Sequence, residues 1–181
     1  MKMKKKSIID LVYCGVFIAL GILLPFITFQ NQKLGQILCL MHIPVLLCGF
    51  ICGPYYGLAA GFITPLLRSV MLGMPPMFPV ALAMAFELAG YGLLSGLLYR
   101  LLPKKIHFSY ISLILAMLGG RLIYGLAAWL LYSAAGNAYS LQIFLSSAFI
   151  TPWPGILLQL VVVVPLMLAV KAAGRKTHEA G

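Results

Sequence analysis

Apolar stretches long enough to cross a bilayer recur along this chain of 181 residues and leave little sequence for anything else. A membrane-spanning helix needs roughly 20 mostly apolar residues, because the hydrocarbon core is about 30 Å thick. Hydrophobic residues make up 62% of the chain and charged residues only 9%, whereas about a quarter of the residues of soluble domains are charged. The sequence therefore predicts an all-α integral membrane protein, a six-transmembrane-helix bundle forming a single domain over residues 1–181, with spans at about 9–27, 37–52, 55–72, 78–102, 109–131 and 155–172.

Two connections are expected to have structure of their own. Residues 29–36 form an outer loop between the first two spans. Residues 140–172 would make a single helix of about 50 Å, which is too long for one crossing. We therefore expect a short outer helix at about 140–150 and a break at Thr151-Pro152-Trp153-Pro154-Gly155. Irregular backbone at membrane depth is tolerated against protein or a watery cavity, so this break is expected to line a cavity.

The net charge of +10 comes from basic residues that gather at the chain ends and in one connection. Such clustering is typical of loops that stay in the cytoplasm, and it argues against nucleic-acid binding. Both termini are therefore expected to be cytoplasmic. The residues are Lys2, Lys4, Lys5, Lys6, Arg100, Lys104, Lys105, Lys171, Arg175 and Lys176.

Several kinds of site have no sequence signal. The cysteines Cys14, Cys39, Cys48 and Cys52 form no C-x-x-C pair, so neither a disulfide framework nor a metal site is indicated. The chain has no phosphate-binding loop and no Ser/His/Asp or His-Glu-x-x-His set. We expect a binding protein and not an enzyme, without a cofactor, which depends on other subunits for ATP hydrolysis.

Four ionisable residues interrupt the apolar spans: His42, Arg68, Glu87 and Arg121. Counting about 1.5 Å of rise per residue places all four at a similar depth in the outer half of the membrane. Ionisable side chains at that depth are candidates for functional sites, because hydrocarbon solvates them poorly. The sequence predicts a buried polar cluster open to the outside, with Trp153 close by.

Each of these residues has more than one interpretation. Glu87 and Arg121 form either a structural ion pair or part of a ligand site. Arg68 has no second carboxylate nearby in the spans, so it meets an anionic group of a ligand or extends to the outer headgroups. His42 is either a satisfied core histidine or a ligand contact. Asn137 is a further polar contact offered by the outer loop.

Gly15 and Ala19 form a small-x-x-x-small pair on the first span. Such a flat helix face suits docking against another helix, either inside this chain or on a partner.

In this order, the motifs resemble those of the substrate-binding S components of energy-coupling factor (ECF) transporters, over essentially the whole chain. The motifs are Gly15-Val-Phe-Ile-Ala19, Met41-His42-Ile43-Pro44-Val45-Leu46-Leu47, Gly53-Pro54-x-x-Gly57, Gly73-Met74-Pro75-Pro76, Glu87-Leu88-Ala89-x-Tyr91-Gly92, Gly120-Arg121 and Pro154-Gly155-Ile156-Leu157-Leu158-Gln159.

The resemblance implies a high-affinity capture subunit in the bacterial cytoplasmic membrane that binds a vitamin or similar micronutrient. Its implied partners are a transmembrane coupling subunit and two ATPases. Family members dock through an Ala-x-x-x-Ala motif on the first span, where this chain has Gly15 and Ala19. From the polar residues of the spans and outer loop, the helix break and the motif residue Tyr91, we predict a substrate-binding set of His42, Arg68, Glu87, Tyr91, Arg121, Asn137 and Trp153.

Within the family, the Met-His-Ile-Pro and Gly-Met-Pro-Pro segments look most like the pantothenate type. Folate, riboflavin, another vitamin or a nucleobase-like precursor remain open as substrates. The alternative function is an autonomous secondary carrier or channel for a small anionic solute. A membrane-embedded enzyme and a purely structural protein are less favoured, because no catalytic set is present and because a structural role leaves the buried Arg68 unexplained.

Overall fold

The computed structural model describes residues 2–28 and 32–179, and within these ranges every regular element is helical. The expected all-α class is confirmed. The six long helices are α1 (Lys2–Leu23), α3 (His42–Cys52), α4 (Pro54–Leu72), α5 (Leu82–Leu101), α6 (Ile106–Ala134) and α8 (Trp153–Glu179). The short elements are η1 (Leu24–Thr28), α2 (Gln32–Leu38), η2 (Met77–Ala81), α7 (Leu141–Leu145) and η3 (Ser146–Ile150).

Five stretches of the described chain are long and apolar enough to cross a membrane, which makes this a multi-pass membrane protein. Helix α4, where a sixth span was expected at 55–72, is not among them. Its 19 residues include Arg68, Pro54 and Pro65, which lower the mean hydropathy. The five stretches are Ser7–Ile27, Lys33–Cys52, Met77–Leu101, Ile106–Ala134 and Trp153–Ala173.

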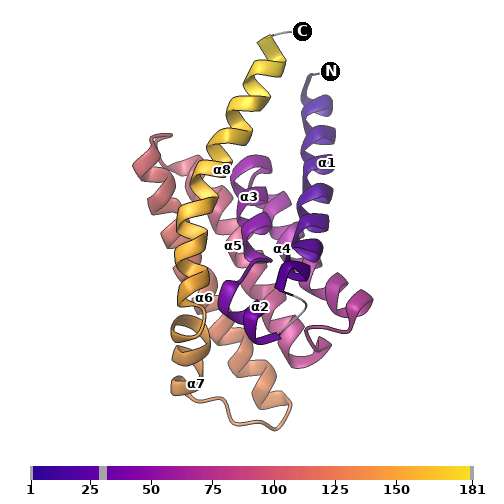
Figure 1. The fold of residues 1–181 in the computed structure, drawn as a ribbon, viewed down its shortest axis with the longest axis vertical. Coiled ribbons are helices and arrows are strands. Elements are labelled where there is room, and N and C mark those ends of the chain that lie inside the picture. Colours follow the sequence, from indigo (N-terminus) through magenta and orange to yellow (C-terminus); the bar gives the residue numbers. More distant parts are fainter. Residues whose placement is uncertain (1, 29–31, 180–181) are drawn as a thin grey trace.

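The first turn of α1 and the last turn of α8 lie at the same end of the molecule (Figure 1). We call this the terminal end. Helices α2 and α7 lie toward the opposite end, which we call the loop end (Figure 1). Both ends of the described chain thus emerge on one side of the bundle.

Helix α3 is the centre of the bundle, and every one of its residues except Ile51 is buried. Helices α1, α4, α5 and α8 pack around it. The turn from α3 to α4 passes through Gly53, whose φ of 104° favours glycine, and Pro54 then begins α4 with a preset φ. Helices α4 and α5 approach so closely that a Cβ on Gly57 or Gly92 would meet the backbone of the other helix.

The segment expected as one span at 37–52 is two helices, α2 and α3, joined by residues 39–41. The break lies at Cys39, which has a φ of 48°. Pro44 sits in the first turn of α3, where its missing N–H is not needed. This break places His42 at the first position of α3, inside the bundle. Of the loop expected at 29–36, residues 29–31 lie outside the described residues, and the remainder belongs to α2.

The outer helix expected at 140–150 is built from α7 and η3, and α8 begins at Trp153 after a turn at residues 151–152. Ser140 caps α7, since its Oγ accepts a hydrogen bond of 3.3 Å from the backbone N–H of Ile143. The chain therefore changes direction where the Thr-Pro-Trp-Pro-Gly segment was expected to break the helix.

Candidate functional site

A cavity of about 620 Å³ lies at the loop end of the bundle. Its wall comes from α2, the start of α3, α4, α5, α6 and the segment from residue 137 to 152. Thr151 and Pro152, from the expected break, are part of that wall. The polar side chains among its lining residues are Gln36, Cys39, His42, Arg68, Glu87, Arg121, Tyr124, Tyr132, Asn137, Tyr139, Ser147 and Thr151.

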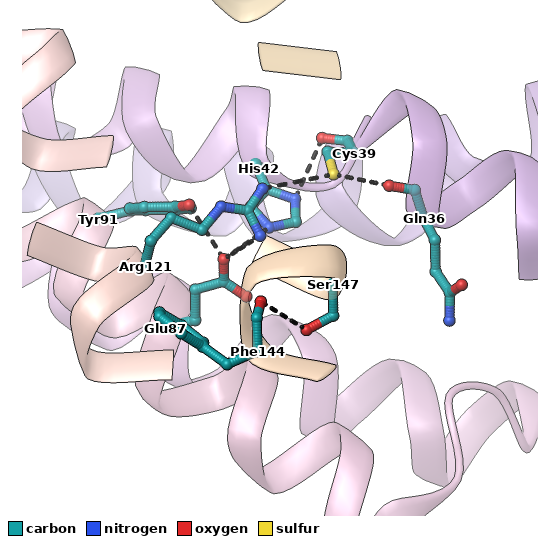
Figure 2. Close-up of polar contacts among 8 residues, drawn as sticks. All are labelled: Gln36, Cys39, His42, Glu87, Tyr91, Arg121, Phe144 and Ser147. Carbon is teal, nitrogen blue, oxygen red and sulfur yellow. Dashed lines mark hydrogen bonds and ion pairs between the residues drawn. The ribbon is translucent and has the colours of Figure 1, made fainter. Parts of the chain in front are cut away.

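Glu87 is the centre of the polar contacts at the cavity wall, and its residue is 2% exposed. Arg121 Nη1 lies 2.8 Å from Glu87 Oε1, and the Tyr91 hydroxyl donates a 3.0 Å hydrogen bond to the same oxygen. His42 Nε2 lies 3.7 Å from that oxygen as well. Figure 2 shows these side chains converging from α3, α5 and α6. One carboxylate oxygen thus connects three helices.

Helical spacing explains part of this arrangement. Glu87 and Tyr91 are one turn apart on α5, so they share a face. The Arg121 guanidinium lies 6.0 Å from the centre of the Tyr91 ring, and its Nη2 lies 3.9 Å from Cys39 Sγ. Both terminal nitrogens of Arg121 are therefore held by protein partners, whereas its Nε has none in the described residues. The expected pairing of Glu87 with Arg121 is present as a buried ion pair, and such a pair is costly to break by removing one member.

His42 has a defined tautomer in this arrangement. Its Nδ1 lies 3.1 Å from the backbone oxygen of Cys39. A carbonyl oxygen only accepts, so Nδ1 carries the hydrogen and a neutral imidazole has its lone pair on Nε2. Nε2 is buried without a hydrogen-bond partner in the described part of the chain. In its neutral form His42 therefore presents Nε2 as an acceptor at the cavity wall, whereas in its protonated form Nε2–H faces Glu87 Oε1 at 3.7 Å.

Arg68 lines the same cavity from α4. Its Nε is buried and has no hydrogen-bond partner, and no carboxylate of residues 7–27 or 33–173 forms an ion pair with it. An uncompensated guanidinium in apolar surroundings is unfavourable unless another group approaches it. Within the described residues, half-buried Arg68 is thus a cation of the cavity wall without an acidic partner.

The structure brings five of the seven expected binding residues to one cavity: His42, Arg68, Glu87, Arg121 and Asn137. Tyr91 does not line it, because it is fully buried behind Glu87. Trp153, expected to lie close by, is 59% exposed and does not line the cavity. As the first residue of α8, it follows the turn at 151–152 and points to the surface of the bundle.

Sequence reasoning missed Tyr124 and Tyr132, which line the cavity together with Tyr139. The rings of Tyr132 and Tyr139 are 5.3 Å apart, and the Tyr139 hydroxyl is buried without a partner in the described residues. A signal was available, because Tyr124 and Tyr132 follow Arg121 at spacings of three and eleven residues, on one face of a helix.

Gly15 and Ala19 are exposed on α1, and a Cβ added to Gly15 would meet nothing within 4 Å. Packing inside this chain, one of the two interpretations of the pair, therefore does not apply to Gly15. No group of three or more His, Cys, Asp or Glu side chains in the described residues could hold a metal ion.

Comparison with known families places this arrangement in context. The family model for the ECF transporter substrate-specific component matches residues 10–167, which include every residue that lines the cavity. No curated protein and no solved structure matches the chain. The helical bundle, its apolar helices and this match lead to one conclusion: the chain belongs to the family of substrate-specific components of ECF transporters.

Proposed function

We propose that this protein captures a small anionic micronutrient, with pantothenate as the best candidate, and delivers it inward through an ECF module. Family membership supports the substrate-capture role and the partnership with a coupling subunit and ATPases. In this proposal ATP is hydrolysed by the partners, and the chain itself binds substrate and has no enzymatic activity.

The observation that carries the proposal is the convergence of unsatisfied polar groups on one cavity. In the described part of the chain, buried side-chain nitrogen or oxygen atoms without a hydrogen-bond partner belong to five residues. Four of them, His42, Arg68, Arg121 and Tyr139, line the cavity. Leaving such groups unpaired is unfavourable, so their concentration at one site indicates that a ligand completes them.

The charge of the cavity favours an anion. Glu87 is neutralised by Arg121, while Arg68 keeps its positive charge. We assign ligand contacts to His42, Arg68, Glu87, Arg121 and Asn137, and we assign Tyr91 the role of holding Glu87 in place. Pantothenate, which combines one carboxylate with hydroxyl and amide groups, suits such a wall.

We also propose that α4 is a sixth span and that the terminal end faces the bacterial cytoplasm. Emergence of both chain ends on one side requires an even number of crossings (Figure 1). Lys171, whose Nζ lies 3.6 Å from the centre of the Tyr99 ring, and the connection that contains Lys104 bring basic groups together away from the cavity. Basic residues of this kind favour the cytoplasmic side.

The function is tested by uptake into liposomes. We expect radiolabelled pantothenate to bind the purified chain, and to be accumulated only when the chain is reconstituted with a coupling subunit and ATPases and ATP is supplied. Accumulation by the chain alone would favour the autonomous carrier. Binding is measured by equilibrium dialysis, because Trp129 and Trp153 both lie outside the cavity lining and report on it poorly.

Gly15→Leu is expected to abolish ATP-driven uptake while leaving ligand binding within about twofold of the unmodified chain. The exposed face around Gly15 and Ala19 is our proposed docking surface for the coupling subunit, and a leucine there prevents close helix approach. Co-purification of the complex measures docking directly. Tyr13→Leu, at an exposed site on the opposite face of α1, is the control and should retain uptake. Normal uptake by Gly15→Leu would place the docking surface elsewhere.

A further inference from the structure

We propose that the cavity holds its ligand in one orientation, with an anionic group at Arg68 and hydrogen-bond donors, hydroxyl or amide N–H, at His42 and Glu87. This inference rests on the proposed capture function and specifies the chemistry of the ligand. It follows from which polar atoms of the cavity wall already have hydrogen-bond or ion-pair partners within the protein. It also follows from the different positions along the bundle of Arg68 and of the acceptors at His42 and Glu87.

The first group is an acceptor surface around His42. Because Nδ1 donates to the backbone oxygen of Cys39, Nε2 of the neutral ring is an acceptor. It faces Glu87 Oε1 at 3.7 Å, and two acceptors cannot bond to each other. A ligand donor placed at Nε2 removes this mismatch.

Glu87 adds a second acceptor to that surface. The contacts from Arg121, Tyr91 and His42 all fall on Oε1, so Oε2 is the oxygen left for a donor. Figure 2 shows the second carboxylate oxygen on the side away from Tyr91. Arg121, held by Glu87 and Cys39, does not offer a free cation here. This end of the cavity therefore favours a neutral, donor-bearing group over an anion.

The second group is Arg68, which offers only donors and a positive charge. Its buried Nε lacks a partner in the described residues. A carboxylate at this guanidinium forms charge-assisted hydrogen bonds, which are the stronger kind.

The packing of α4 on α5 sets the offset along the bundle between the backbone positions of Arg68 and Glu87. Gly57 meets Gly92 and Gly61 meets Leu88, so the two antiparallel helices are in a defined register. Arg68 lies eleven residues beyond Gly57 toward the loop end, whereas Glu87 lies five residues beyond Gly92 in the same direction. At about 1.5 Å per residue, the backbone positions differ by about 9 Å along the bundle.

The ligand class is therefore a monoanion that carries its carboxylate at one end and hydroxyl or amide donors toward the other. Hydroxyacyl derivatives of amino acids, such as pantothenate, have this form. A cationic ligand would place its positive charge next to the Arg68 guanidinium, where like charges repel each other. Phosphorylated ligands call for more than one free cation, and Arg121 is occupied.

The test compares pantothenate with two analogues that each lack one end. Panthenol carries a hydroxymethyl group in place of the carboxylate, and the dideoxy analogue carries hydrogen in place of both hydroxyls. Arg68→Gln is expected to weaken pantothenate binding about 10- to 100-fold and panthenol binding by no more than about threefold. His42→Leu is expected to abolish the preference for pantothenate over the dideoxy analogue while keeping the preference over panthenol.

Arg100→Gln is the matched control, because it removes the same charge from α5 outside the cavity lining and should bind all three ligands like the unmodified chain. Arg68→Lys, which keeps the charge, should recover part of the loss. Thermal melting of each purified variant shows that it is folded. Equal loss of pantothenate and panthenol binding in Arg68→Gln overturns the proposed orientation, as does an unchanged preference in His42→Leu.

Failure of the capture function gives a different result. A panel of anionic, neutral and cationic vitamins is tested on the unmodified chain. Tight binding of a cation or of a neutral ligand overturns the present inference and keeps the capture function. Binding of another hydroxylated monocarboxylate supports the inference and overturns only the choice of pantothenate. No binding of any ligand to folded protein overturns both.

Discussion

Replacing Glu87 by alanine is expected to lower the free energy of unfolding by about 3–5 kcal/mol and to abolish ligand binding. The substitution leaves the Arg121 guanidinium buried without its carboxylate and removes the acceptor of the Tyr91 hydroxyl. Both groups then remain in apolar surroundings without their main partner. Equilibrium unfolding of the detergent-solubilised protein measures the loss, and equilibrium dialysis measures binding.

Two further variants separate the ion pair from the other contacts of Glu87. Tyr91→Phe removes one hydrogen bond to Oε1 and is expected to cost about 1.5 kcal/mol. The double variant Glu87→Leu/Arg121→Met replaces the pair by apolar side chains and should recover most of the stability without recovering binding. A loss below about 1 kcal/mol in Glu87→Ala would show that water or a rearrangement compensates Arg121, and would contradict this account.

Replacing Gly92 by alanine is expected to destabilise the bundle by about 2–3 kcal/mol, although alanine is the better helix former. A Cβ at this position would meet the backbone of Gly57 on α4, and backbone cannot move aside as a flexible side chain does. Helices α4 and α5 would have to separate. Because their register also sets the distance between Arg68 and Glu87, we expect weaker ligand binding as well.

Gly15→Ala is the matched control for this prediction. It is the same substitution within a helix, but a Cβ on Gly15 would meet nothing within 4 Å. The difference between the two variants therefore isolates packing from helix propensity. We expect Gly15→Ala to leave stability unchanged or to raise it by up to about 1 kcal/mol. Equal effects of the two variants would exclude close packing of α4 on α5 as the cause.

The ionisable residues of the site were predictable, whereas their partners were not. His42, Arg68, Glu87 and Arg121 interrupt apolar stretches. Ionisable residues in membrane spans are unfavourable in hydrocarbon, so they are candidates for functional sites in any membrane protein. Depth counting placed them at one level. The register of α4 and α5 separates Arg68 from Glu87 by about 9 Å along the bundle, within one cavity. The predicted depth of a residue is its number of residues from the helix end multiplied by the rise per residue. An error in the position of that end therefore shifts the predicted depth of every residue in the helix.

The rotation of each helix about its axis was harder to predict from the sequence than the depth of its residues. Trp153 was expected near the cavity and lies at the surface, and Tyr91 was expected to bind ligand and lies behind Glu87. In water, the apolar face of a helix identifies its buried side. In lipid both the packed face and the outer face are apolar, so this signal is weak.

The sequence by itself determined the helical membrane class, the positions of the polar interruptions and, through its ordered motifs, the ECF substrate-specific family. These depend on composition and on order along the chain. Only the tertiary structure decided that side chains from three helices meet at one oxygen of Glu87, that His42 Nε2 has no hydrogen-bond partner in the described residues, and that Arg68 lines the same cavity. Those outcomes depend on how helices rotate and approach one another, which close packing at Gly57 and Gly92 sets and local sequence does not.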